Sequence, residues 1–100
     1  MFYNVLNAKK MIDSSKMFEK MTLLEKDNSS LSLIAIKKEE IIDTHTSVCD
    51  AAVYLVEGKI ELHFDAQMFT LEENDILMFK KDHQHKVRAL KDSKFLLIKI

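Results

Sequence analysis

The sequence predicts an all-β fold, a sandwich or barrel built from short antiparallel strands. Three observations support this prediction. Short runs of apolar, β-branched and aromatic residues recur along the chain, and clusters of Asn, Asp, Ser and Lys separate them. The spacing within the runs is mostly that of strands, most clearly in Lys59–Phe64, where Ile60, Leu62 and Phe64 alternate with polar residues.

Length and composition restrict the class of protein. One hundred residues predict one domain, 1–100, with a core large enough to fold alone. The 15 basic and 16 acidic residues nearly cancel, so neither a nucleic-acid nor a membrane partner is expected. One cysteine excludes an internal disulfide and fits a reducing compartment. With no signal-peptide pattern and no run of membrane-spanning length, we expect a cytoplasmic protein.

The first thirty residues are expected to form an N-terminal extension and strands. Phe2–Leu6 is a candidate short strand. Met11–Lys26 is ambiguous, because Met17 and Met21 recur at helical spacing while other residues of the same stretch alternate as in a strand. We favour a strand over Lys20–Glu25, with at most one short helix before it.

The middle of the chain predicts three strands. Leu31–Ile36 is almost unbroken in apolar character, which indicates a buried strand. Thr44–Val56 is rich in Thr, Val and Tyr, which suit strand geometry. Gly58, the chain's one glycine, follows it at a turn where positive φ favours glycine. We expect Thr44–Val56 and Lys59–Phe64 to form a strand pair on either side of Gly58.

The remaining strands are separated by polar turns at roughly regular spacing. The composition of Asp65-Ala66 predicts a hairpin turn, and charged residues occupy the loop Lys80–Gln84. The predicted strands are Gln67–Leu71, a buried Ile76–Phe79, His85–Leu90 and Lys94–Ile100.

Two of these strands are apolar on both faces, Leu31–Ile36 and Phe95–Ile100. Internal packing rarely covers both faces of an antiparallel sheet. We therefore expect a homodimer in which a partner covers one sheet.

The stretch that leads to Gly58 offers the wall of a pocket. Strand alternation places small and mixed side chains together on one face: His45, Ser47, Cys49, Ala51 and Val53. A face of this kind fits a narrow barrel or a ligand pocket.

Residues 39–58 and 74–89 have the spacing of two paired motifs, Gly-x5-His-x-His-x3,4-Glu-x6-Gly and Gly-x5-Pro-x-Gly-x2-His-x3-Asn. His45, Gly58 and His85 match by identity, three of ten fixed positions, and the fifteen-residue spacer between the motifs also fits. In this register the chain resembles the cupin superfamily. The resemblance implies a conical β-barrel of two antiparallel sheets with little helix. The motif positions that differ are Glu39, Asn74 and Asp82 for glycine, Ser47 for histidine, Ala51 for an acidic residue, Lys80 for proline and Ala89 for asparagine.

The resemblance also implies where a metal would bind, and most of those ligands are replaced. Of the family's ligand positions only His45 and His85 keep a metal-binding side chain. A catalytic metal normally has about three protein ligands. Cys49 or His83 would have to supply the third, although a buried thiol and a solvated loop imidazole are their commoner roles. We therefore favour a decayed site in which both histidines are hydrogen-bonded pocket residues, with no cofactor.

Two functions follow from this interpretation. The favoured one is a non-catalytic cupin that binds a small molecule or another protein, with no catalytic residue. The alternative is a metal-dependent enzyme, a small dioxygenase or isomerase, which uses His45, His85 and an unconventional third ligand to hold Zn²⁺, Ni²⁺, Mn²⁺ or iron. The candidate pocket residues are His45, Ser47, Cys49, Ala51, His85 and Ala89.

Positive charge concentrates around the second motif. A carboxylate or phosphate site is one interpretation of this cluster, but Lys86 and Arg88 alternate away from His85 and Val87, so we favour a solvated strand face. The cluster consists of Lys80, Lys81, His83, Lys86 and Arg88.

Overall fold

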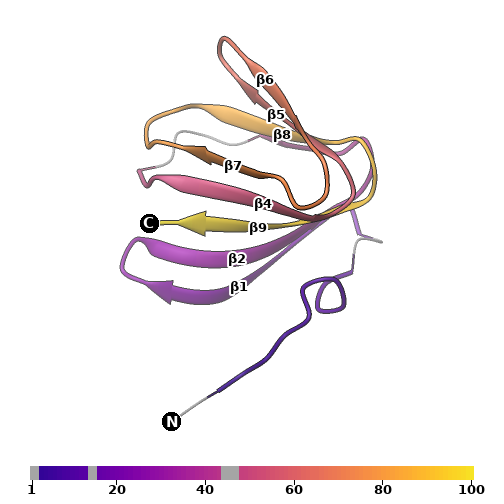
Figure 1. Cartoon of the computed structure of the whole chain (residues 1–100), viewed down its shortest axis with the longest axis vertical. Helices are drawn as coiled ribbons and strands as arrows, with labels where there is room; N and C mark the ends of the chain where they lie inside the picture. The colour runs from indigo at the N-terminus through magenta and orange to yellow at the C-terminus, as the bar shows by residue number, and fades with distance from the viewer. Residues whose placement is uncertain (1–2, 14–15, 44–47) are drawn as a thin grey trace.

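The computed structural model describes residues 3–13, 16–43 and 48–100, and within them nine antiparallel strands form two sheets. One sheet has the order β1-β2-β9-β4-β7 and the other β3-β8-β5-β6 (Figure 1). The strands are β1 (Phe18–Lys26), β2 (Ser29–Ile36), β3 (Ile41–Asp43), β4 (Ala51–Glu57), β5 (Ile60–Phe64), β6 (Met68–Leu71), β7 (Ile76–Phe79), β8 (His85–Ala89) and β9 (Ser93–Lys99). No helix in these ranges is long and apolar enough to cross a membrane.

The main core lies between the inner faces of the two sheets. Alternation along each strand turns every second side chain inward, as in β5, where Ile60 and Leu62 are both fully buried. The core residues are Ile34, Ile36, Val53, Leu55, Ile60, Leu62, Leu71, Val87, Ala89 and Phe95.

A second, smaller core lies on the outer face of the five-stranded sheet. Leu33 and Ala35 of β2 point outward there, and Ile12 of the N-terminal segment packs against them. Lys94 donates a hydrogen bond to the backbone oxygen of Lys9, which helps to hold this segment in place. The chain itself thus covers part of the face that we expected a partner to cover.

The outer face of the four-stranded sheet is charged instead. Arg88 of β8 donates a hydrogen bond from Nη2 to Glu39 Oε2 over 2.8 Å. Its Nη1 lies 3.9 Å from Oε1 of Glu61 in β5. Glu61 is in turn 3.0 Å from the ring of His63. These side chains satisfy one another at the surface.

Most strand predictions are confirmed. A strand covers Lys20–Glu25 within β1, and β5 pairs with β6 around the turn Asp65-Ala66. The predicted pairing around Gly58 is wrong, because β4 pairs with β7 and β9 while β5 pairs with β6 and β8. The turn therefore joins the two sheets.

Gly58 is required at this turn for two reasons. Its φ is +98°, which favours glycine. A Cβ at this position would also lie 2.2 Å from Ser93 Oγ and 2.5 Å from the Asp92 backbone oxygen. A side chain at this position would therefore push against the start of β9.

Three further expectations need correction. Residues 3–6 form no strand, since the N-terminal segment packs on a sheet face and pairs with no sheet edge. The strand predicted from Thr44 begins only at Ala51, because the chain bends at Val48 and Cys49; residues 44–47 lie outside the described residues. In β7, which we expected to be buried, Ile76 and Met78 are 56% and 74% exposed, because they alternate outward on the edge of the sheet.

Candidate functional site

A cavity of about 410 Å³ opens between the two sheets at one end of the barrel. Its walls come from strands of both sheets, and they combine apolar side chains with a few polar ones. The apolar lining includes Phe18, Ile34, Ile42, Ala51, Phe79 and Leu97. The polar lining includes Lys20, Asn28, Asp43, Cys49, His85 and Lys99.

Three of the predicted pocket residues line this cavity, namely Cys49, Ala51 and His85. Ala89 does not line it, because it is fully buried in the main core. The predictions for His45 and Ser47 fall outside the described residues. The structure therefore brings together the residues at the start of β4 and the start of β8.

Cys49 is held as a buried thiol. Cys49 is only 7% exposed. Its Sγ donates a hydrogen bond to the backbone oxygen of Asn28, with 3.0 Å between the two atoms. This geometry agrees with a packing role.

His85 has a defined ring orientation. Its Nδ1 lies 3.0 Å from the backbone oxygen of His83, so Nδ1 carries a hydrogen and, in the neutral ring, Nε2 carries the lone pair. The ring centroid is 4.6 Å from that of Phe79 and 5.8 Å from that of Phe64. Aromatic packing and the hydrogen bond to His83 thus help to position the imidazole at the cavity wall.

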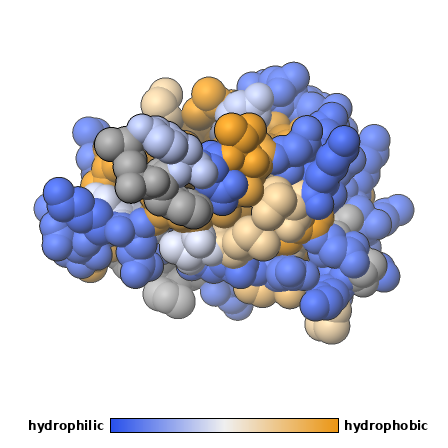
Figure 2. All heavy atoms as spheres, turned by 90° about the horizontal axis from the view of Figure 1, so that it is seen from below, coloured by the Kyte–Doolittle hydropathy of each residue, from blue (hydrophilic) through white to orange (hydrophobic). Residues whose placement is uncertain are grey.

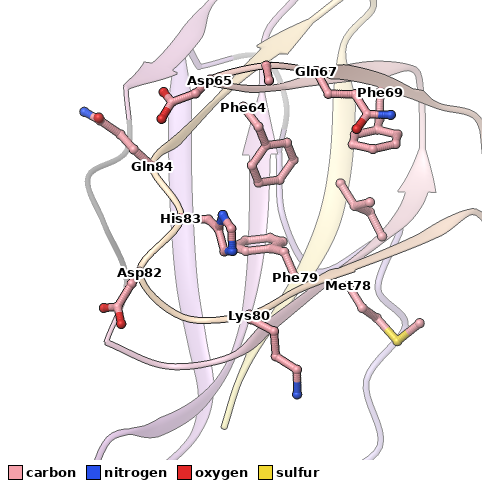
Figure 3. A pocket seen from close by; sticks show the side chains of 12 residues that line it. Phe64, Asp65, Gln67, Phe69, Met78, Phe79, Lys80, Asp82, His83 and Gln84 are labelled. Atoms are coloured by element: carbon pink, nitrogen blue, oxygen red, sulfur yellow. The ribbon is translucent and has the colours of Figure 1, made fainter.

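A second opening of about 630 Å³ lies between the β5–β6 hairpin, β7 and the loop after β7. Figure 3 shows the rings of Phe64, Phe69 and Phe79 gathered in its middle, with Asp65 and Asp82 toward its periphery. Phe64 packs edge to face on both other rings, at centroid distances of 5.3 Å to Phe79 and 5.9 Å to Phe69. Phe79 lines both openings and therefore forms part of the wall between them.

The cations at the barrel mouth were missed by sequence reasoning. Lys20 follows the inward series of β1 as the cross-strand partner of Ile34, and Lys99 continues the inward series of Phe95 and Leu97 in β9. For Lys99 the available signal was a lysine that continues an apolar alternating series, whereas β1 contains several charged residues and gives no such signal for Lys20. Periodicity within each strand does not reveal the shared cavity, because β1 and β9 lie at opposite ends of the sequence and only the tertiary structure places them in one sheet.

The basic residues of the second motif have other roles. Lys86 is exposed on the outer face of the four-stranded sheet, and Arg88 forms an ion pair with Glu39. The Nζ of Lys80 lies 3.5 Å from Oδ2 of Asp50. The pKa of Asp50 lies below its ordinary value, first because the backbone N–H of Lys81 donates to it, and then through the charge of Lys80. Asp50 thereby ties the loop after β7 to the start of β4.

Comparison with solved structures identifies this arrangement of strands. A conserved protein of unknown function from Streptococcus pyogenes matches with a TM-score of 0.87 over 100% of this chain and 89% of its own, at 20% identity. A cupin superfamily protein from Desulfitobacterium hafniense matches with a TM-score of 0.86 over 93% and 85%, at 22% identity. A cupin 2 conserved barrel domain protein from Leptotrichia buccalis gives 0.89 over 94% of this chain and 46% of its own, at 23% identity.

The chain has the cupin fold. No protein-family model and no curated protein matches the sequence. At these identities the likeness concerns the fold, and one cupin fold serves many unrelated functions. The function of this chain therefore depends on the chemistry of its site.

The backbone keeps the cupin motif geometry where the residues have changed. Four non-glycine residues among those described have positive φ, and three of them stand at glycine positions of the two motifs. Their φ angles are 75° for Glu39, 76° for Asn74 and 69° for Asp82. The agreement supports the register in which the motifs were compared, because φ in this region is uncommon for residues with a Cβ.

The described residues of this cupin fold do not by themselves make a metal site. Within residues 3–13, 16–43 and 48–100, no group of three or more His, Cys, Asp or Glu side chains is placed to hold a metal ion. His85 and Cys49 line one cavity but fall short of the three protein ligands of a catalytic metal.

Proposed function

We propose that this protein is a non-catalytic cupin that binds a small molecule with an apolar body and an anionic group at the barrel mouth. The observation that carries the proposal is the composition of the cavity, in which Lys20 and Lys99 join walls that are otherwise mainly apolar. Its volume of about 410 Å³ lies in the usual range for small-molecule sites.

The apolar walls supply affinity and the lysines supply selectivity. Burial of a ligand's apolar body against Ile34, Ile42 and Leu97 removes apolar surface from water, at about 25 cal/mol per Å². Two ammonium groups oppose one carboxylate, Asp43, so the charged part of the lining is net positive. A ligand carboxylate would gain charge-assisted hydrogen bonds there.

The surroundings of Cys49 support binding without catalysis. Cys49 is buried, and its Sγ donates a hydrogen bond to the backbone oxygen of Asn28, which fits a small thiol packed in the cavity wall. The His85 ring is oriented by His83 and packed on Phe79, which suits a wall that contacts a ligand.

A matched pair of probes tests the proposal. Phenylacetate should produce saturable NMR shifts at Ala51 and Leu97, and phenylacetamide should bind at least tenfold more weakly. Lys99→Met should abolish the preference for the carboxylate, while Lys86→Met, which alters a lysine on the outer face, should leave it unchanged. Absence of saturable shifts, or an unchanged preference in Lys99→Met, would refute the proposal.

Elemental analysis of the untagged protein tests the enzyme alternative. We expect the protein to contain little metal after purification. Near-stoichiometric iron, manganese, nickel or zinc that is lost in both His45→Ala and His85→Ala would favour the metal-dependent enzyme and overturn the non-catalytic proposal.

A further inference from the structure

The sandwich is open along one side, where β6 and β7 are the edge strands of their sheets. Four side chains continue the inward series of β5, β6 and β7 and are nevertheless only half-buried. They line the opening of about 630 Å³ described above, and they are Phe64, Phe69, Leu77 and Phe79. The facing strands thus leave part of the inner aromatic surface accessible from outside.

The three phenylalanine rings of this opening lie at steep angles to one another. Figure 3 shows the ring of Phe64 nearly face on, with Phe69 to one side of it and Phe79 below it. The planes of Phe69 and Phe79 are inclined by 78° and 69° to that of Phe64. The rings therefore border one opening with surfaces that are nearly perpendicular to each other.

This aromatic lining favours a particular kind of group. The face of an aromatic ring attracts a cation that lies within about 6 Å of the ring centroid. A primary ammonium has three N–H donors, and the rings in the middle of the opening offer no ordinary acceptor for them. A quaternary ammonium donates no hydrogen bond, so it can rest on the rings without losing one.

The charges around the opening also favour a cation. Asp65 and Asp82 lie toward its periphery (Figure 3), and within the part of the chain that the structure describes neither carboxylate forms a hydrogen bond or an ion pair. Lys80 lines the opening as well, but its Nζ lies 3.5 Å from Oδ2 of Asp50. A bound cation would supply the counterion that Asp65 and Asp82 lack.

Apolar surface alone does not mark this site. On the side of the molecule that Figure 2 shows, apolar surface also gathers in the middle, with hydrophilic residues on either side. The opening between β6 and β7 differs because three aromatic rings and two carboxylates line the same hollow.

We propose that this opening is a second ligand site, which binds an organic cation through a quaternary ammonium head group. The volume of about 630 Å³ lies in the range of small-molecule sites and leaves room for a body attached to the head group. The site does not depend on the anion site at the barrel mouth, because Phe69, Asp65 and Asp82 line only the opening between β6 and β7.

Choline and its uncharged isostere 3,3-dimethylbutan-1-ol test the proposal on the full chain. Choline should produce saturable NMR shifts at Ala66 and Leu77, which line the opening, and the alcohol should bind at least fivefold more weakly. Phe69→Leu, which removes one ring and keeps an apolar side chain, should reduce the preference for choline at least threefold. Phenylacetate shifts at Ala51 and Leu97 should persist in this variant, because Phe69 does not line the barrel mouth.

A charge variant tests the two carboxylates. Asp65→Asn combined with Asp82→Asn should weaken choline at least threefold and leave the alcohol unchanged. Glu73→Gln is the matched control, because it removes an exposed carboxylate that lines a different opening, and it should change neither probe. Both aspartates are exposed, and asparagine tolerates the φ of 69° at Asp82, so the double variant should fold.

The outcomes separate this site from the anion site. Absence of saturable choline shifts, equal affinity for the alcohol, or an unchanged preference in Phe69→Leu or in the aspartate variant would overturn the proposal. A preference for choline that depends on Phe69 and the aspartates would support it whether or not phenylacetate binds at the barrel mouth.

Discussion

The two sheets share one core but differ on their outer faces. The outer face of the five-stranded sheet is apolar, and the N-terminal segment covers the part that includes Leu33 and Ala35. On the outer face of the four-stranded sheet, Arg88 forms ion pairs with Glu39 and with Glu61 in contact with water. The apolar residues on the inner faces of both sheets thus form the main core. The residues on the outer faces differ, so that the N-terminal segment packs on one outer face and the other stays in water.

The difference has a simple physical basis. An antiparallel sheet needs only one buried face, and a polar second face is stable in water. An apolar second face requires a cover, because exposed contiguous apolar surface favours association. In this protein the chain supplies part of that cover itself.

The largest expected effect comes from Leu33→Ala, beneath the N-terminal segment. Leu33 is 1% exposed although it points away from the main core. If the covered face is a true second core, the free energy of unfolding should fall by about 2–5 kcal/mol, measured by urea denaturation at fixed protein concentration.

Met68→Ala is the counterpart on the four-stranded sheet. Its side chain is 47% exposed, and we expect a loss of less than about 1 kcal/mol. Equal losses for Leu33→Ala and Met68→Ala would remove the distinction between the two outer faces.

For Gly58→Ala, at the turn that joins the sheets, we expect a loss of stability that exceeds that of Met68→Ala and does not exceed that of Leu33→Ala. Positive φ and the contact with Ser93 Oγ both oppose a Cβ, and together they should cost about 2–3 kcal/mol. Gly58→Asn separates the two causes, because asparagine tolerates positive φ but still has a Cβ. If steric contact dominates, both variants should lose similar stability in urea denaturation; recovery in Gly58→Asn would show that φ alone matters.

The smallest effect concerns the ion pairs of the four-stranded sheet. The pKa of Glu39 lies below its ordinary value, first because Arg88 donates a hydrogen bond to the carboxylate and second through the charge of Arg88. A carboxyl whose pKa is lowered on folding adds stability above its unfolded pKa, and this stability is lost as the pH falls through the folded pKa.

Arg88→Ala should therefore raise the pKa of Glu39 toward its ordinary value, as measured by NMR titration of its side-chain carboxyl. The stability lost between neutral and acidic pH should shrink accordingly. Lys86→Ala, on the same strand, should leave the Glu39 pKa in place. A Glu39 pKa that stays low without Arg88 would contradict the assigned cause.

The sequence by itself determined the local features of this protein. Alternation and turn composition predicted most strands, because strand geometry repeats every two residues and is visible in short windows. Motif spacing predicted the cupin fold, and the positive φ angles at Glu39, Asn74 and Asp82 agree with that register. Gly58 was identified as a turn from its residue type alone.

Only the tertiary structure decided how these pieces meet. Whether β4 pairs with β5 or with β7 and β9 depends on contacts between distant segments, which local periodicity does not contain. The same holds for Lys20 and Lys99, which reach one cavity because the first and last strands share a sheet. Leu33 is covered because the N-terminal segment packs over β2, and Met78 is exposed because β7 forms the edge of its sheet. Both are properties of the assembled barrel.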